Sequence, residues 1–176
     1  PFIEQPLLSP DQHEAYMQPS VSEESASIYE HCARALDRSL PVGKHGLPLM
    51  GGGDWNDGMN RVGHKGKGES VWLGWFLYMT LAAFTPHVEA RRQRVRINRY
   101  RKHLENLRKA LEEKAWDGDW YRRAYFDDGT PLGSARNEEC RIDSIAQSWS
   151  VISGASDPYR MGRAMAAVEE YLIRRG

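Results

Sequence analysis

A glycine-rich stretch at residues 46–60 reads Gly46-Leu47-Pro48-Leu49-Met50-Gly51-Gly52-Gly53-Asp54-Trp55-Asn56-Asp57-Gly58-Met59-Asn60. Its three consecutive glycines let the backbone adopt conformations closed to other residues and leave room for a ligand beside the main chain. Trp55 offers a flat apolar face for a sugar ring, and the polar residues around it, Asp54, Asn56 and Asp57, offer oxygens for hydroxyl groups and a candidate proton donor. The stretch suits carbohydrate chemistry, although the same residue types also dominate ordinary turns.

Other loop motifs do not fit this stretch. Counted from Asp54, a calcium-binding EF-hand loop would need an oxygen ligand at Gly58, a glycine at Met59 and a glutamate at Lys65. No glycine run ends in the Gly-Lys-Ser/Thr of a P-loop, and none completes a dinucleotide fingerprint. The histidines show no spacing typical of metal ligands, so the sequence predicts no metal.

Composition limits the kinds of partner. The chain has 24 basic and 24 acidic residues among 176, so no overall field attracts nucleic acid or an anionic membrane. The basic run at 91–102 is interpreted as a solvated helix face rather than a phosphate or lipid site. The longest apolar run, at 71–84, is too short to span a membrane. Two distant cysteines, Cys32 and Cys140, favour a reducing compartment.

The spacing of apolar residues predicts a mainly helical chain. A first helix is expected to begin near Ser22, because apolar residues then recur every four positions, and to end before Pro41. A second helix is expected over 69–84, with Pro86 interrupting or restarting it. A third is expected over 96–115, where one apolar stripe continues for its whole length.

The second half of the chain mixes short strands and helices. Aromatic residues and turn formers at 116–134 predict a short hairpin around Asp127-Asp128-Gly129. Helices are expected at 143–153 and after Ser156-Asp157-Pro158, a good cap followed by proline in the first turn. The buried stripe of that last helix is expected to be Met161, Met165, Val168 and Leu172. The loop at 44–68 has few large apolar residues, so its order must come from tertiary packing or a ligand, and we expect it to line a cleft.

Besides the glycine-rich stretch, five further segments match a known family, and they occur in the same order in this chain as in the family. They are Gln12-His13-Glu14-Ala15-Tyr16, Glu23-Glu24-Ser25-Ala26-Ser27-Ile28-Tyr29-Glu30-His31-Cys32, Arg34-Ala35-Leu36-Asp37-Arg38-Ser39-Leu40, Gly68-Glu69-Ser70-Val71-Trp72-Leu73 and Arg141-Ile142-Asp143-Ser144-Ile145-Ala146-Gln147-Ser148-Trp149. The chain resembles family 94 of the glycoside hydrolases, and the resemblance covers nearly its whole length. Within that family, the combination of the segments at 12–16, 34–40 and 141–149 most resembles the C-terminal phosphorylase-like region of bacterial cyclic β-1,2-glucan synthases.

The resemblance implies a fold. Family members carry an (α/α)6 barrel, and this chain has material for roughly half of one. We therefore expect residues 1–176 to form part of such a catalytic domain, mainly α with a short β-hairpin insertion, cut from a longer chain with no signal peptide at this end. The family's phosphate site includes a Glu-Asn-Gly-Gly segment that would lie beyond residue 176. The isolated chain is expected to be inactive and to aggregate or depend on the remainder of the polypeptide.

The resemblance also implies roles for the residues of the stretch. The residue matching Asp57 is the general acid that protonates the glycosidic oxygen in the family, and phosphate replaces the second carboxylate and water of an inverting hydrolase. To hold a proton near neutral pH, Asp57 needs burial or a like charge nearby, such as Asp54 or phosphate. Trp55 would contact the sugar, while Asp54 and Asn56 would fix the loop or bind hydroxyls.

The expected activity is inverting phosphorolysis of linear β-1,2-glucan to glucose 1-phosphate and a shortened chain. Inorganic phosphate is a co-substrate, and no cofactor is expected. The expected location is the bacterial cytoplasm, tethered to the inner membrane through the rest of the protein, with no membrane or nucleic-acid contact by this segment. The alternatives are a stand-alone β-glucan or cellobiose-type phosphorylase, an inverting hydrolase with Glu69 as base, and a non-catalytic carbohydrate-binding or scaffold module.

Several further residues have competing interpretations. Glu69 is more readily explained by a structural role at a helix start, where the helix dipole stabilises acidic residues. His13 and His45 flank the glycine-rich stretch and are candidate substrate contacts, but a surface or capping role is favoured. Asp119 precedes Trp120 as Asp54 precedes Trp55, yet it is expected to pack the hairpin. Two residues of the last matched segment, Gln147 and Trp149, are candidates to face the barrel interior, although an inward polar residue can simply satisfy buried backbone groups.

Overall fold

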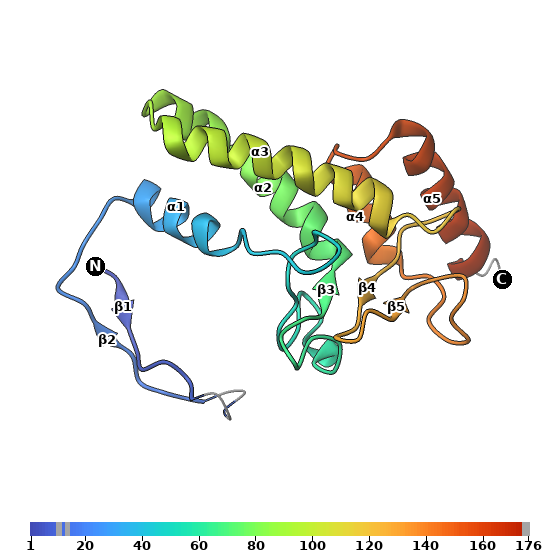
Figure 1. Cartoon of the computed structure of the whole chain (residues 1–176), viewed down its shortest axis with the longest axis horizontal. Coiled ribbons are helices and arrows are strands. Elements are labelled where there is room, and N and C mark those ends of the chain that lie inside the picture. Colours follow the sequence, from blue (N-terminus) through green and yellow to red (C-terminus); the bar gives the residue numbers. More distant parts are fainter. Residues whose placement is uncertain (10–11, 13–14, 174–176) are drawn as a thin grey trace. The chain divides into compact units, whose positions relative to one another are not determined.

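A computed structural model describes residues 1–9, 12 and 15–173 of the chain and shows a mainly helical protein with two small sheets (Figure 1). The chain divides into two compact units, Pro1–Ser39 and Leu40–Gly176. His13 lies outside the described residues. Among those that are described, no helix has both the length and the apolar character needed to cross a membrane.

The first unit is a two-stranded sheet followed by one helix. Its elements are β1 Ile3–Glu4, β2 Ser20–Val21 and α1 Ile28–Arg38. The prediction that the first helix begins near Ser22 is wrong. Ser27 is the N-cap, and its side chain accepts a hydrogen bond from the Glu30 backbone. Ser22 instead donates to the carboxylate of Glu4, and this contact keeps the preceding backbone extended against β1.

The second unit holds four long helices. They are α2 Val71–Ala90, α3 Arg94–Ala110 continued by the π-helical turn Leu111–Ala115, α4 Ser144–Ile152 and α5 Pro158–Leu172. The prediction that Pro86 interrupts the second helix is wrong, because α2 continues four residues beyond it. A proline inside a helix costs about 3 kcal/mol. Packing of α2 against α3 and α4 offsets that cost, since α2 buries side chains along its whole length.

The predicted hairpin is confirmed and forms part of a three-stranded antiparallel sheet. Its strands are β3 Glu69–Ser70, β4 Ala124–Tyr125 and β5 Pro131–Leu132, in the order β3-β4-β5. The turn between β4 and β5 closes through a bond from the Phe126 N–H to the Thr130 carbonyl. Because β3 runs directly into α2, the sheet fixes where α2 begins.

The last two helices begin where the sequence predicts, near Asp143, which is the N-cap of α4, and at the predicted cap Asp157. The predicted buried stripe of α5 is confirmed only at Val168. Ala164, Ala167 and Val168 are buried, whereas Met165 and Leu172 are exposed. The small alanines form the face on which α5 packs against α4. Side-chain size, which an apolar pattern ignores, therefore selects the buried face.

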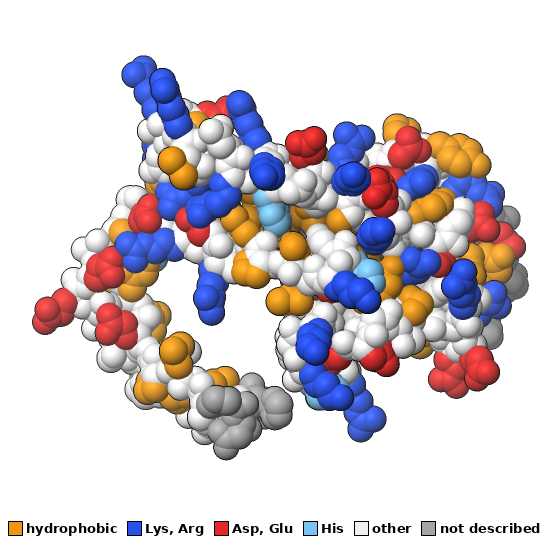
Figure 2. Space-filling view, viewed as in Figure 1, with side chains coloured by type: hydrophobic (Ala, Val, Ile, Leu, Met, Phe, Trp, Pro, Cys, Tyr) orange, Lys and Arg blue, Asp and Glu red, His pale blue; other side chains and the backbone are white. Residues whose placement is uncertain are grey.

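Basic side chains gather where α2 turns into α3 (Figure 2). Arg92 and Arg94 are exposed there, and Arg101 pairs with Glu89 at 2.7 Å. The interpretation of this basic run as a solvated helix face agrees with its exposure.

Candidate functional site

The glycine-rich loop, residues 40–68, has little regular structure and is held by buried carboxylates. Glu69, only 1% exposed, accepts hydrogen bonds from the backbone N–H groups of His45 and Leu47 and from His45 Nδ1. A Cβ at Gly43 would lie 2.5 Å from the Glu69 carboxyl carbon, so a larger residue there would displace the buried Glu69 side chain. His45 also stacks on Tyr125, with ring centroids 3.8 Å apart. Glu69 and His45 therefore hold the loop in place. The role of Glu69 is structural, but it lies in β3, before the α2 cap Ser70, and binds the loop instead of the helix start.

Asp127, in the turn after β4, holds the far end of the same loop. Its carboxylate accepts hydrogen bonds from the backbone N–H groups of Lys65, Lys67 and Gly68 at 2.8–3.0 Å. Desolvation tends to raise the pKa of Asp127, but these three donors lower it below its ordinary value. Two carboxylates outside the loop, Glu69 and Asp127, thus order it by binding its backbone, as expected if tertiary contacts rather than local structure hold the loop.

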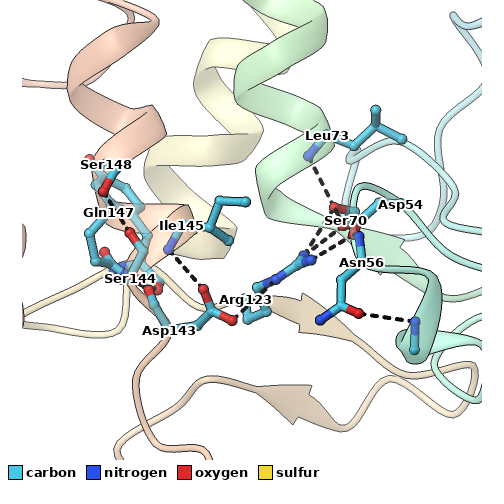
Figure 3. A network of polar contacts seen from close by, with 12 residues as sticks. Asp54, Asn56, Ser70, Leu73, Arg123, Asp143, Ser144, Ile145, Gln147 and Ser148 are labelled. Atoms are coloured by element: carbon cyan, nitrogen blue, oxygen red, sulfur yellow. Dashed lines mark hydrogen bonds and ion pairs between the residues drawn. The ribbon is translucent and has the colours of Figure 1, made fainter. Parts of the chain in front are cut away.

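Asp54 is the third carboxylate that holds the loop, and it anchors the segment at residues 54–60. Arg123 Nη1 and Nη2 donate to its two oxygens at 2.7 and 2.6 Å, and the Ser70 hydroxyl donates at 2.5 Å (Figure 3). The Asp54 side chain is 0% exposed and that of Arg123 2%. Burial tends to raise the pKa of Asp54, but the bonds from Arg123 and Ser70 lower it below its ordinary value. Asp54 is thus an ionised anchor.

This ion pair also joins the starts of two helices. The Ser70 hydroxyl accepts a hydrogen bond from the Leu73 N–H and so caps α2. Asp143 caps α4 through the Ile145 N–H, and its other oxygen lies 3.4 Å from Arg123 Nε (Figure 3). Arg123 Nε makes no hydrogen bond to any described residue, so its attraction to Asp143 is electrostatic. The loop, α2 and α4 consequently meet at one guanidinium group.

The Asp57 turn, residues 53–60, projects from this anchor. Asn56 N donates to Asp54 Oδ1 at 3.1 Å, and Asn56 Oδ1 accepts from the Gly58 N–H at 3.0 Å, capping the 3-10 turn Asp57–Met59. Gly53 has φ +153°, and a Cβ there would lie 3.4 Å from the Asp57 Cα. The glycine thus meets a conformational need, as its place in a glycine run predicts.

The tip of the turn exposes three of the four predicted site residues together. Trp55 is 73% exposed, and Asn56 and Asp57 are exposed as well. The Asp57 carboxylate makes no hydrogen bond or ion pair with any residue that the structure describes. Asp54, the fourth, lies in the buried base, and of its two expected roles the structure favours fixing the loop over binding hydroxyls.

An aromatic cluster lies beside the turn. The Trp55 ring is 6.4 Å from that of Trp72, which stacks on Phe76 and meets the edge of Trp149. Gln147, by contrast, is fully buried, and its amide bonds the backbone of Tyr121 in both directions. Trp149 thus belongs to the aromatic cluster, while Gln147 satisfies buried backbone groups.

Sequence reasoning missed the residues that hold the site, above all Arg123, Ser70, Asp127 and Asp143. The available signal was an arginine pair, Arg122 and Arg123, in an aromatic hairpin where apolar residues are expected. Asp119 forms an ion pair with Arg163 on the surface and takes no part in the site.

A cavity of about 510 Å³ opens on another side of the loop. Loop residues such as Lys44, His45 and Lys67 line it, as a cleft-forming loop predicts, but Asp57 and Trp55 do not. Across the described ranges, no three His, Cys, Asp or Glu side chains are grouped to hold a metal ion.

Comparison with known proteins places the chain in context. The model of the glycosyl hydrolase 94 superfamily catalytic domain matches residues 11–176. The chain is 58% identical over 174 residues to the cyclic beta-(1,2)-glucan synthase NdvB of Rhizobium meliloti (strain 1021), covering 98% of this chain and 6% of the synthase. It is 36% identical over 149 residues to the 3-O-beta-D-glucopyranosyl-beta-D-glucuronide phosphorylase of Paenibacillus borealis, covering 84% of this chain and 19% of that enzyme.

One more relative and one solved structure extend the comparison. The solabiose phosphorylase of Paenibacillus borealis is 36% identical over 159 residues, covering 88% of this chain and 20% of that enzyme. Among solved structures, a GH78 family rhamnosidase of Bacillus sp. GL1 matches 82% of this chain and 14% of its own, with a TM-score of 0.60 at 18% identity, which shows a shared fold. The chain spans 6% of the synthase and about a fifth of the phosphorylases.

Proposed function

The chain belongs to the glycosyl hydrolase 94 superfamily, and from that premise we propose that it contributes the general acid of an inverting β-1,2-glucan phosphorylase. In this proposal the chain is the chain-length-controlling region of a cyclic β-1,2-glucan synthase. The observation that carries the proposal is the Asp57 turn, which exposes a carboxylate and an indole together on a rigid, ion-paired base. The similarity of the chain to a cyclic glucan synthase and to several phosphorylases supports the choice of reaction.

The proposed reaction replaces one bond by another at a single carbon. An oxygen of inorganic phosphate attacks the anomeric carbon of the terminal glucosyl unit, and the bond from that carbon to the glycosidic oxygen breaks. Asp57 donates its proton to the departing oxygen, so the products are α-glucose 1-phosphate and a glucan shorter by one unit. Trp55 would support the sugar ring through its exposed face, and Asn56 would orient the turn through its cap.

The residues around Asp57 do not by themselves favour its protonated form. The described residues neither bury the carboxylate nor place an unpaired carboxylate beside it, since Asp54 is neutralised by Arg123. Bound sugar and phosphate would therefore supply the apolar cover and the like charge that an acid near neutral pH needs.

A hydrolase that uses Glu69 as its base is disfavoured. A base must reach a water molecule on the face of the sugar opposite the acid. Glu69 is 1% exposed, and its carboxylate is already occupied by donors from His45 and Leu47. Activity without phosphate would nevertheless identify a hydrolase with another base, and binding without turnover would identify a carbohydrate-binding module.

We also propose that residues 1–176 form part of an (α/α)6 catalytic domain whose remaining helices cover this chain and supply the phosphate site. Support comes from the exposed apolar side chains Phe76 on α2 and Val151 and Ile152 on α4. The isolated chain is then expected to aggregate or to need the rest of the polypeptide. Light scattering tests this, and a monomer that unfolds cooperatively would contradict it.

The test of the proposed function measures glucose 1-phosphate released from linear β-1,2-glucan by the natural full-length protein, with and without inorganic phosphate. Phosphate-dependent release that Asp57→Asn abolishes and the matched surface variant Asp119→Asn retains is the expected result. Release from cellobiose instead of β-1,2-glucan would indicate a cellobiose-type phosphorylase. Unphosphorylated products formed without phosphate would indicate a hydrolase.

A further inference from the structure

We propose that Arg123 is a positioning residue that sets the orientation of Asp57 through Asp54, without touching substrate. The inference rests on the proposed function, because it gives Arg123 a part in the reaction that Asp57 would carry out. It concerns a residue in the hairpin, distant in sequence from the glycine-rich loop.

The first step is the geometry of the buried pair. Two parallel hydrogen bonds from the planar guanidinium to the two Asp54 oxygens fix both the position and the plane of that carboxylate. Lysine would keep the charge but could not make this two-pronged contact. The Ser70 hydroxyl and the Asn56 N–H complete the set of donors to Asp54. Asp54 therefore has one allowed orientation.

The second step leads from Asp54 to Asp57. Asp54 Oδ1 receives the Asn56 N–H, and Asn56 Oδ1 receives the Gly58 N–H, so hydrogen bonds hold the residues on both sides of Asp57. The Asp57 carboxylate itself has no partner among the described residues. Its direction depends on the backbone of the turn, and that backbone depends on Asp54 and hence on Arg123.

The third step is the rigidity of Arg123 itself. Its backbone N–H donates to the Leu132 carbonyl at 2.8 Å, and its carbonyl accepts the Val71 N–H at 3.2 Å. A Cβ at Gly133 would lie 2.6 Å from the Arg123 nitrogen, so the neighbouring backbone packs tightly against it. Arg123 is thus fixed to β5 and to the start of α2 before its side chain reaches Asp54.

The charge of Arg123 also neutralises Asp54. Without that cation, Asp54 would be a buried, uncompensated anion. Arg123→Lys keeps the charge and loses the two-pronged contact, so it isolates the geometric contribution. Misplacement of a catalytic group by about 1 Å can cost 100-fold in rate.

The test compares Arg123→Lys with Arg122→Lys in the natural full-length protein. Arg122 is the adjacent arginine, but it bonds Asp117, Tyr125 and the Lys114 carbonyl instead of Asp54. For Arg123→Lys we expect kcat to fall about 10- to 100-fold, with KM for glucan and phosphate unchanged within about twofold. In Arg123→Lys, hydrogen exchange should accelerate in residues 51–60 and not in α2. Arg122→Lys should leave both kcat and the exchange of residues 51–60 unchanged.

Several outcomes would overturn the inference. One is an unchanged kcat in Arg123→Lys, and another is a lower kcat/KM that comes from a higher KM alone. A third is faster hydrogen exchange in α2 and α4 as well as in the turn. If Arg123→Lys does not fold, Asp54→Asn weakens the same pair while keeping its shape, and it must then lower kcat at constant KM. If the unmodified protein releases no phosphate-dependent product, the proposed function fails, whereas a normal rate in the unmodified protein together with an unaffected variant refutes only the role of Arg123.

Discussion

The base and the tip of the Asp57 turn carry the same kind of side chain in opposite surroundings. Asp54 is buried, ionised and bound by Arg123 and Ser70, whereas Asp57 is exposed and without a partner among the described residues. Only three positions separate them. The difference shows that Asp54 is bound within the fold while the Asp57 carboxylate faces solvent, so changes at the two positions should affect different properties.

The largest expected effect is the loss of activity in Asp57→Asn. If Asp57 is the general acid, as proposed, its removal lowers the rate about 10²- to 10⁴-fold. An exposed side chain without partners contributes little to folding, so the free energy of local unfolding should change by less than about 0.5 kcal/mol. Phosphorolysis rates and native-state hydrogen exchange of residues 51–60 measure the two quantities. A large stability loss in this variant would remove the distinction between base and tip.

The reverse pattern is expected when the base is broken. Asp54→Ala leaves the buried Arg123 guanidinium without its two-pronged partner, which should destabilise the loop by about 3–5 kcal/mol. The matched control is Asp119→Ala, which breaks a solvent-exposed pair with Arg163 and should leave exchange in residues 40–68 unchanged. Equal effects of the two variants would show that the buried pair is no stronger an anchor than a surface contact.

The sequence predicted the tip far better than the base. Trp55, Asn56 and Asp57 are adjacent in a glycine-rich stretch, and local chemistry is enough to mark them as an exposed turn. The partner of Asp54 lies 69 residues away in the hairpin, and no local pattern connects the two. A buried ion pair is a tertiary contact, so its partner becomes evident only when the hairpin is placed beside the loop.

The helices show the same limit. Local hydrogen bonds set the cap at Asp157 and the helix start at Asp143, and the sequence predicted that cap and a helix start near Asp143. The continuation of α2 past Pro86 and the alanine face of α5 depend on packing against neighbouring helices, which residue patterns do not encode. Prediction therefore succeeded where a few adjacent residues decide and failed where distant elements compete.

The stability that Asp54 contributes at the base of the turn should depend on pH. The pKa of Asp54 is lowered from 3.8 in the folded protein, so its ionised form stabilises the fold above that pH. This contribution is lost as the pH falls through the lowered value. The stability gap between the unmodified protein and Asp54→Asn, from exchange corrected for intrinsic rates, should be constant between pH 7 and 5 and shrink below 3.8. A gap that shrinks already between pH 7 and 5 would mean that the pKa is raised instead.

The smallest expected effect concerns the aromatic part of the tip. Trp55→Ala removes a ring that is 73% exposed and whose centroid lies 6.4 Å from that of Trp72, so loop stability should change little. If the ring supports a sugar, KM for the glucan should rise about 2- to 10-fold, equivalent to ~0.5–1.5 kcal/mol of aromatic contact. Tyr159→Ala is the matched control, since Tyr159 is 74% exposed on α5 and takes no part in the turn. A KM that moves equally in both variants would assign the effect to general surface change, whereas a shift in Trp55→Ala alone, at constant loop exchange, would place substrate binding at the tip and loop stability at the base.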